Sequence, residues 1–115
     1  MLKISEITND AVQNRTIILP DETEFDIQIR YVPQQLGWFI ESLTYQDFSV
    51  SGIRIVNSYN LLYQYTDLIP FGIACFSSGH REPALQEDFA SGSSELFLLT
   101  PSDKIELERF ITDGE

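Results

Sequence analysis

The strictest pattern in this sequence is the alternation of apolar and polar residues over residues 24–31. The apolar members are Phe25, Ile27, Ile29 and Tyr31. The polar members are Glu24, Asp26, Gln28 and Arg30. Successive side chains of a β-strand point to opposite faces, so a period of two indicates a strand with one buried face and one wet face. A chain built on such a strand must supply neighbouring strands and an apolar layer to cover the buried face.

The segments on either side of this strand predict two hairpins. Residues 15–19 include three β-branched residues in a row, and the turn-forming residues 20–23 connect them to the alternating strand. Pro33 should end that strand, because proline has no N–H to donate to the ladder. A second hairpin is expected from the aromatic and β-branched residues 38–45 and 48–56, joined by a tight turn.

Gly52 marks a change in the phase of the apolar residues within the second hairpin. Phe48 and Val50 occupy even positions before it, whereas Ile53 and Ile55 occupy odd positions after it. A single extra residue in one strand produces such a change, and glycine inside a strand often marks the place. The sequence therefore predicts a β-bulge or a sharp bend at Gly52.

The middle of the chain departs from the strand pattern. Asn57 or Ser58 is expected to cap a short helix over residues 61–65. Residues 72–76 form an apolar run that is typical of a buried strand. The serine- and glycine-containing residues 77–94 form the longest predicted loop, with one helical turn near residues 86–89, and loops of this length are usually functional or ordered by a partner.

The end of the chain predicts one more strand and then a helix. Residues 95–99 are apolar enough for a strand. Thr100 is a suitable helix cap, Pro101 suits the first helical position and Asp103 stands where a capping-box acid belongs. Residues 101–115 are therefore expected to form a C-terminal helix or tail.

Together these segments predict a mainly β fold. We expect a compact antiparallel small barrel or sandwich of about six or seven strands with one or two short helices. Residues 1–115 are expected to form a single domain, because the sequence shows neither a repeat nor a linker. Strand count alone leaves the choice between barrel and sandwich open.

The charge of the chain limits its partners. Eighteen acidic residues against seven lysines and arginines give a formal net charge of −11. Affinity for nucleic acids and for anionic membranes depends on clustered basic residues, and here these residues are scattered singly. We therefore expect no direct binding of nucleic acid and no association with a membrane. The sequence also contains no apolar run of the length needed to span one.

Residues that could perform chemistry are few, and no catalytic, metal or cofactor-binding site is predicted. Cys75 lies in an apolar run, so a buried structural thiol is expected, although His80 follows nearby in the long loop. The four carboxylates of residues 21–26 lack the framework of a calcium loop and are expected to be solvated. The adjacent acids Glu87 and Asp88, like Glu41, form no recognisable catalytic pair. We expect a protein that is not an enzyme and needs no cofactor.

Aromatic residues provide the remaining candidates for function. Interfaces between proteins are enriched in Tyr, Trp and Phe, and interior packing is the alternative role for the same residues. The candidate contacts with a partner or with other copies of the chain are Trp38, Tyr59, Tyr63, Tyr65 and Phe89.

Five runs of this sequence together resemble a known family. They are NRTIILPD (14–21), YVPQQLGWF (31–39), GIRIVNSYNLL (52–62), IPFGIACF (69–76) and LFLLT (96–100). In order and spacing they are similar to the small baseplate plug family of contractile-tailed bacteriophages, of the myovirus and cyanophage type. The resemblance covers about residues 10–100, and the segment after residue 103 lies outside it.

This resemblance implies a structural component of the virion, made in the host cytoplasm and located in the tail baseplate. The family implies β-rich subunits at the hub–tail tube junction, with hub or spike proteins and tail tube proteins as partners. It also implies a homo-oligomer, a three- or six-fold ring. The net charge of −11 per chain would give such a ring an acidic wall that repels the phosphates of passing DNA. The alternative is a small β-sandwich or barrel module that binds a carbohydrate or other small ligand through Trp38, Tyr59 and Tyr63.

Overall fold

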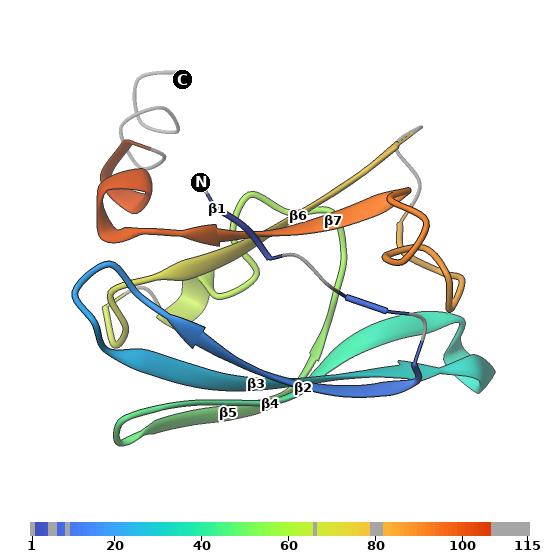
Figure 1. The fold of residues 1–115 in the computed structure, drawn as a ribbon, viewed down its shortest axis with the longest axis horizontal. Coiled ribbons are helices and arrows are strands. Elements are labelled where there is room, and N and C mark those ends of the chain that lie inside the picture. The colour runs from blue at the N-terminus through green and yellow to red at the C-terminus, as the bar shows by residue number, and fades with distance from the viewer. Residues whose placement is uncertain (1, 5–6, 9, 66, 79–81, 107–115) are drawn as a thin grey trace.

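The chain forms a sandwich of two antiparallel β-sheets (Figure 1). The computed structural model describes residues 2–4, 7–8, 10–65, 67–78 and 82–106. One sheet has three strands in the order β1-β7-β6 and the other has four in the order β2-β3-β4-β5. The strands are β1 (Leu2–Ile4), β2 (Val12–Ile18), β3 (Glu24–Val32), β4 (Gly37–Tyr45), β5 (Phe48–Arg54), β6 (Gly72–Ser77) and β7 (Ser94–Leu99). The mainly β prediction is confirmed, and of the two architectures left open the sandwich is the one observed.

The first hairpin forms as the alternation predicts. The buried face of β3 carries all four apolar residues of the alternating run, and β2 pairs with β3 along its length. The connecting turn closes through hydrogen bonds from the Leu19 amide to the Thr23 carbonyl at 2.7 Å and from the Glu22 amide to the Leu19 carbonyl at 2.9 Å. The Asp21 carboxylate accepts from the Thr23 amide, which is the Asx-turn geometry that this residue type favours. At Pro33 the strand gives way to the 3-10 turn η1 (Pro33–Gln35).

The phase change in the second hairpin is real, but its bulge lies in β4 and not at Gly52. The register between β4 and β5 is uniform, with Ile40 opposite Ile53 and Leu43 opposite Val50. The register shifts instead between β3 and β4, because Gln28 pairs with Ser42 whereas Ile29 pairs with Ile40. One extra residue, Glu41, therefore stands in β4. Gly52 lies beside it in β5 with φ of 73°, a conformation that lets β5 follow the bend.

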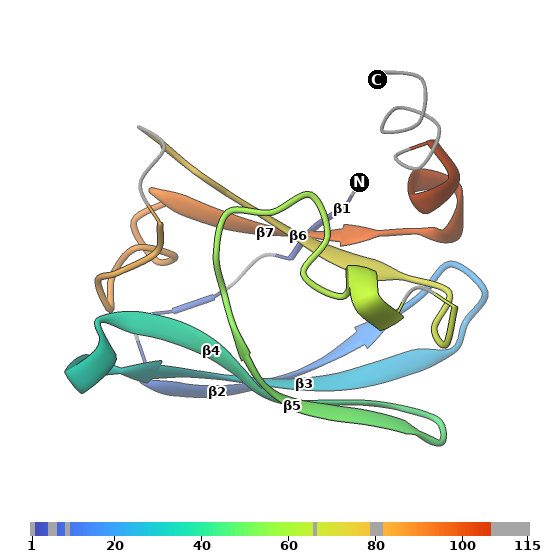
Figure 2. The same ribbon diagram turned by 180° about the vertical axis from the view of Figure 1, so that it is seen from behind.

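The connection from β5 to β6 closes one side of the sandwich (Figure 2). The Ser58 and Cys75 backbones form an antiparallel bridge, and the Leu61 amide donates to the Ile73 carbonyl at 2.7 Å. The predicted helix over residues 61–65 is reduced to the 3-10 turn η2 (Tyr63–Tyr65). Its cap is Asn60 and neither Asn57 nor Ser58: the Asn60 side-chain oxygen accepts from the Leu62 amide at 2.9 Å and from the Ile73 amide at 3.2 Å. The hydrogen bonds that Leu61 and Asn60 form with Ile73 of β6 hold this segment to the sheet, and no longer helix forms there.

The predicted helix start after β7 is confirmed. Residues 101–106 are helical, and the segment after residue 106 lies outside the described residues. The Thr100 amide donates to the Asp103 carboxylate at 3.0 Å, and the Asp103 amide donates to the Thr100 hydroxyl at 3.3 Å, which is a reciprocal capping box. The buried Lys104 ammonium donates to the Ile69 carbonyl at 2.8 Å and ties the helix to the chain before β6.

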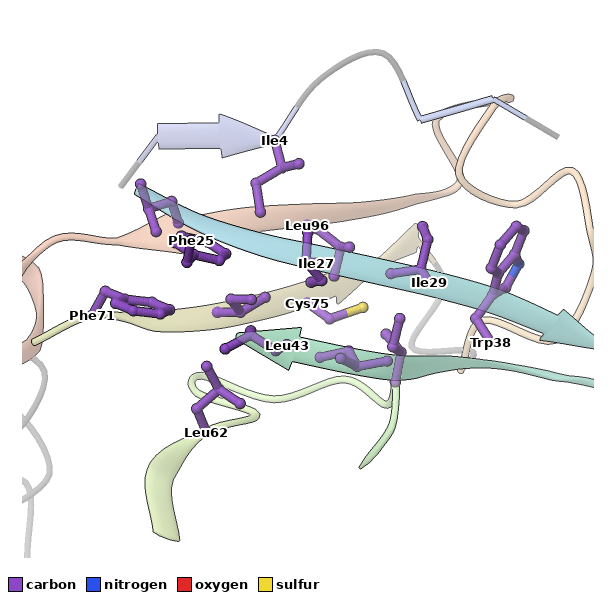
Figure 3. Packing of buried hydrophobic residues seen from close by; sticks show 14 of the residues in the cluster. Ile4, Phe25, Ile27, Ile29, Trp38, Leu43, Leu62, Phe71, Cys75 and Leu96 are labelled. Carbon is purple, nitrogen blue, oxygen red and sulfur yellow. The ribbon is translucent and has the colours of Figure 1, made fainter. Parts of the chain in front are cut away.

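The core lies between the two sheets and draws on both of them (Figure 3). Phe25 of β3 stacks on Phe71, just before β6, with ring centroids 4.2 Å apart. Tyr45 of β4 meets the edge of the same Phe71 ring at 5.3 Å. Phe71 is fully buried, so it joins the four-stranded sheet to the chain that enters the other sheet.

We expect Phe71→Ala to lower the free energy of unfolding by about 3–5 kcal/mol, because it removes a large side chain from a close-packed core and leaves a cavity. Chemical denaturation followed by tryptophan fluorescence measures this change. Leu36→Ala is the control, since that side chain is 59% exposed and its loss should cost little. A cost below about 1 kcal/mol for Phe71→Ala would contradict the role assigned to this ring.

Candidate assembly surfaces

Trp38 and Phe89 are core residues in this fold. Trp38 is fully buried, and its ring meets the edge of the Phe89 ring with centroids 5.5 Å apart. The Trp38 indole N–H donates to the Leu85 carbonyl at 3.1 Å, and the Tyr31 hydroxyl donates to the Ala84 carbonyl at 2.8 Å. Of the two roles weighed for these aromatics, interior packing is the one that the structure gives to Trp38 and Phe89. They hold the described part of the long loop against β3 and β4.

A buried carboxylate holds the same loop from within. Asp88 is 2% exposed, and its carboxylate accepts from the amides of Ala84 and Leu85, both at 2.8 Å. The Ser94 amide, at the start of β7, donates to the Asp88 carbonyl at 2.9 Å. The predicted helical turn near residues 86–89 is present as hydrogen-bonded turns without a regular helix. Contacts within the chain therefore hold residues 82–93 in place without a partner.

We expect Asp88→Asn to destabilise the protein by about 1–3 kcal/mol, because the neutral amide is a weaker acceptor and brings a buried N–H₂ group that needs partners. Glu87→Gln removes the same charge from the exposed neighbouring residue and is the matched control. Chemical denaturation of both variants measures the difference. Equal stabilities would show that the Asp88 charge does not hold the loop.

The three tyrosines occupy more open positions. Tyr59 and Tyr63 are 59% and 58% exposed, and Tyr65 is half-buried. The Tyr59 ring meets the edge of Phe76 at 5.8 Å, and Phe76 in turn lies 5.7 Å from Phe97 on the outer side of β7. Tyr65 instead packs on Phe48 of β5 at 5.4 Å. Trp38 is fully buried, so its ring is not open to a ligand as the alternative built on Trp38, Tyr59 and Tyr63 requires.

A mainly apolar pocket lies at the end of the sandwich where three connections meet. These are the β2–β3 turn, the chain before β6 and the start of the C-terminal helix (Figure 1). Its volume is about 260 Å³, and it is lined by Leu19, Pro20, Asp21, Pro70, Thr100, Pro101 and Ser102. Leu68 lies two residues before the lining residue Pro70 and Ile105 lies three residues after Ser102, and their side chains are 67% and 59% exposed. Three prolines and these aliphatic side chains give the pocket end a rigid, apolar surface.

A row of side chains crosses the outer face of the four-stranded sheet near its other end. The register places Val12 beside Arg30, Arg30 beside Phe39 and Phe39 beside Arg54, so the row reaches from β2 to β5. The Arg54 guanidinium carbon lies 5.4 Å from the centre of the Phe39 ring, a cation–π contact. A side chain at Gly37 would collide with this guanidinium, since its Cβ would lie 2.7 Å from the Arg54 Nη2 atom. We call these four residues the Arg–Phe row.

The Arg–Phe row was not predicted from the sequence. Its members are far apart in the chain, and only the strand register brings them together. In the sequence, Arg30 and Arg54 stand as isolated single charges and Phe39 belongs to an aromatic strand. The signal that points to the row is the bulge in β4, because it decides whether Phe39 or Trp38 faces the core.

The candidate residues for chemistry do not assemble into a site. Among the residues that the structure describes, no group of three or more His, Cys, Asp or Glu side chains is placed to hold a metal ion. In the acidic run, the Asp21 and Asp26 carboxylates are exposed and accept from the hydroxyls of Thr23 and Thr16. Hydrogen bonds from Thr23 hold the pKa of the Asp21 carboxyl below its usual value. His80 lies outside the described residues.

Cys75 is a fully buried thiol in β6. Burial, with a smaller contribution from the charge of Glu82, raises the pKa of the Cys75 thiol to about 12. Because only the thiolate is a nucleophile, this thiol is inert at neutral pH.

We expect native protein at pH 8 to react with a chromogenic disulfide reagent far more slowly than denatured protein does. A pKa near 12 in place of 9.0 lowers the thiolate fraction about a thousandfold. The absorbance released per chain, with and without guanidinium chloride, measures this protection. Rapid stoichiometric labelling of the native protein would contradict the burial of Cys75.

The family of the chain that carries these surfaces is shown by comparison with known proteins. Residues 1–101 match the family described as "Cyanophage baseplate Pam3 plug gp18". The chain belongs to this family. No curated protein matches it.

Family membership gives the chain a structural role as a plug protein of the phage tail baseplate, a location in the virion tail and contacts with other baseplate components. The match extends the resemblance noted in the sequence to the N-terminus and stops at Pro101, where the helix begins. In the described part of the chain, no helix is long and apolar enough to cross a membrane.

Proposed function

We propose that the chain is a plug subunit at the junction between the baseplate hub and the tail tube, and that it works by protein–protein contact alone. The observation that carries this proposal is the family match over nearly the whole of the described chain. The hub or spike protein and the tail tube protein are the partners, and copies of the chain assemble in a three- or six-fold ring.

The surfaces of the sandwich support a role in assembly. Interfaces favour exposed aromatic residues and arginine, and here Tyr59, Tyr63 and the Arg–Phe row provide both. The unreactive Cys75 thiol and the solvated carboxylates of the β2–β3 turn agree with a protein that acts by contact and catalyses no covalent reaction. The net charge of −11 suits a subunit beside a DNA channel, because an acidic wall repels phosphates.

Co-expression with the hub and tail tube proteins of the same phage tests the proposal. We expect a stable complex of fixed stoichiometry on affinity purification and size-exclusion chromatography with light scattering. A chain that passes both proteins without binding would overturn the proposal, as would purified phage particles that lack it. Binding to an immobilised glycan, in place of these proteins, would favour the ligand-binding alternative.

We expect the double change Tyr59→Ser and Tyr63→Ser to weaken the complex with hub or tube protein about tenfold or more, since buried interface tyrosines are frequent hot spots. Leu85→Ser is the control, because the Leu85 side chain is 45% exposed and lies in the loop between β6 and β7, outside the Arg–Phe row and the pocket end. Titration calorimetry with the purified partner measures both variants. Unchanged affinity would remove these tyrosines from the contact and leave the complex itself unaffected.

A further inference from the structure

The basic side chains of this acidic protein are unequally placed. Of the five that the structure describes, Lys104 is buried against the Ile69 carbonyl and Lys3 pairs with Glu95 on the three-stranded sheet. The Arg15 guanidinium, in β2, donates to the Asn14 carbonyl at 2.9 Å. Arg30 and Arg54 instead flank Phe39 on the outer face of the four-stranded sheet. Both arginines are exposed, and the Arg30 side chain keeps 52% of its surface open although it pairs with Glu41 at 3.5 Å. The Arg–Phe row is thus a surface with positive charge on both sides of an aromatic ring.

The pocket end has the opposite character. Asp21 lines the pocket, and three further acidic residues stand close to lining residues in the sequence: Glu22 in the same turn, Glu24 at the start of β3 and Asp67 three residues before Pro70. We call these four carboxylates the rim. All four carboxylates are exposed. The basic residue nearest to the pocket in the sequence is Lys104, and its ammonium donates to the Ile69 carbonyl. An apolar pocket with an acidic rim fits an apolar group that is flanked by positive charge.

The two surfaces lie at opposite ends of one strand. The wet face of β3 reads Glu24, Asp26, Gln28, Arg30 from the pocket end to the Arg–Phe row. Six residues of extended chain separate the first of these from the last, which corresponds to about 20 Å. An ion pair needs contact within about 4 Å, so one chain cannot join its own two surfaces. A second copy can.

We propose that the Arg–Phe row of one copy docks on the proline-lined pocket end of the next copy. Arg30 and Arg54 meet the carboxylates of the rim, and Val12 and the open side of Phe39 cover the pocket formed by Leu19, Pro20, Pro70 and Pro101. The contact joins two different surfaces, so it repeats from copy to copy and closes into a ring when the rotation between copies allows. This inference rests on the proposed function and names the contact that would build its ring.

The net charge of the chain does not forbid this contact. Two copies of charge −11 repel each other as a whole, but at physiological salt the screening length is about 8 Å. The repulsion between charges farther apart than this length is largely screened, whereas arginines and carboxylates in direct contact attract each other with little screening. Guanidinium groups also pair with carboxylates through parallel hydrogen bonds, which fixes the orientation of the partner.

Two charge reversals test the proposal on the full chain. We expect Arg30→Glu and Glu22→Lys each to weaken self-association at least tenfold, as measured by sedimentation velocity and light scattering against the monomer mass of 13.2 kDa. The matched controls are Lys3→Glu, which breaks an exposed ion pair of equal length on the other sheet, and Glu87→Lys in the long loop. Both controls should assemble as the wild type does.

Mixing the two defective variants gives the sharpest result. In the mixture, the intact Arg–Phe row of Glu22→Lys meets the intact pocket end of Arg30→Glu. At the other contact the glutamate introduced by Arg30→Glu faces the lysine introduced by Glu22→Lys, so the reversed charges attract again, and we expect paired complexes that can grow further, although neither variant assembles alone. Ser102→Phe fills the pocket from the exposed start of the helix and leaves the rim acidic, so its mixture with Arg30→Glu should stop at complexes of one copy of each variant. Thermal unfolding checks that every variant is folded.

Other outcomes would overturn the proposal. These are a wild type that stays monomeric at millimolar concentration, reversals that assemble normally, or a mixture that forms no paired complex. Each leaves the proposed function intact if the wild type still binds hub or tube protein. Failure to bind either of these proteins, with self-association preserved, would instead overturn the proposed function and keep this contact.

Discussion

The extra residue in β4 determines which side chains of this chain reach the core. Before Glu41 the buried residues of β4 are Trp38 and Ile40, and after it they are Leu43 and Tyr45. A strict period of two would send one of these pairs to the outer face, because a shift of one residue reverses every side chain. Exposing a pair of this size would cost about 1.5–3 kcal/mol for each side chain. The bulge removes that conflict, and the positive φ of Gly52 carries β5 through the same bend.

The same choice of phase organises the rest of the molecule. With Trp38 inside, its indole N–H reaches the Leu85 carbonyl, and the long loop gains a fixed position against the sheet. With Phe39 outside, its ring lies between Arg30 and Arg54, where it is available to a partner. Adjacent residues of one strand thus serve the core and the surface. Which of Trp38 and Phe39 faces the core depends on the position of the bulge in β4.

The sequence predicts the periodic parts of this fold and misses what depends on contacts between distant segments. The alternation around Ile27 and Ile29 gives β3 and its buried face, and the capping box of Thr100 and Asp103 gives the helix start, because both signals are local. The three residues of β1 are too few to show a period, so its pairing with β7 was not predicted. A glycine is visible in the sequence, which is why Gly52 predicts a β-bulge or a sharp bend there. The strand register that locates the bulge at Glu41 is not visible in the sequence.

The candidate site shows the same limit. Aromatic composition alone does not distinguish Trp38 and Phe89, which hold a loop inside the fold, from Tyr59 and Tyr63, which face solvent. The pocket end joins residues from three parts of the chain, and the Arg–Phe row joins residues from four strands. Surfaces of this kind arise from topology, and local sequence patterns do not record them.

The distribution of charge along β3 bears on the proposed contact between copies of this acidic chain. An evenly spread charge of −11 would repel neighbouring copies wherever they met. Here the wet face of β3 runs from Glu24 to Arg30, so each copy has an acidic end and an end with exposed arginines. In the proposed contact, unlike ends meet through the exposed arginines of the described chain, and the carboxylates outside the rim face solvent. A ring built in this way would keep its negative potential toward DNA because its positive charges are enclosed at the subunit contacts.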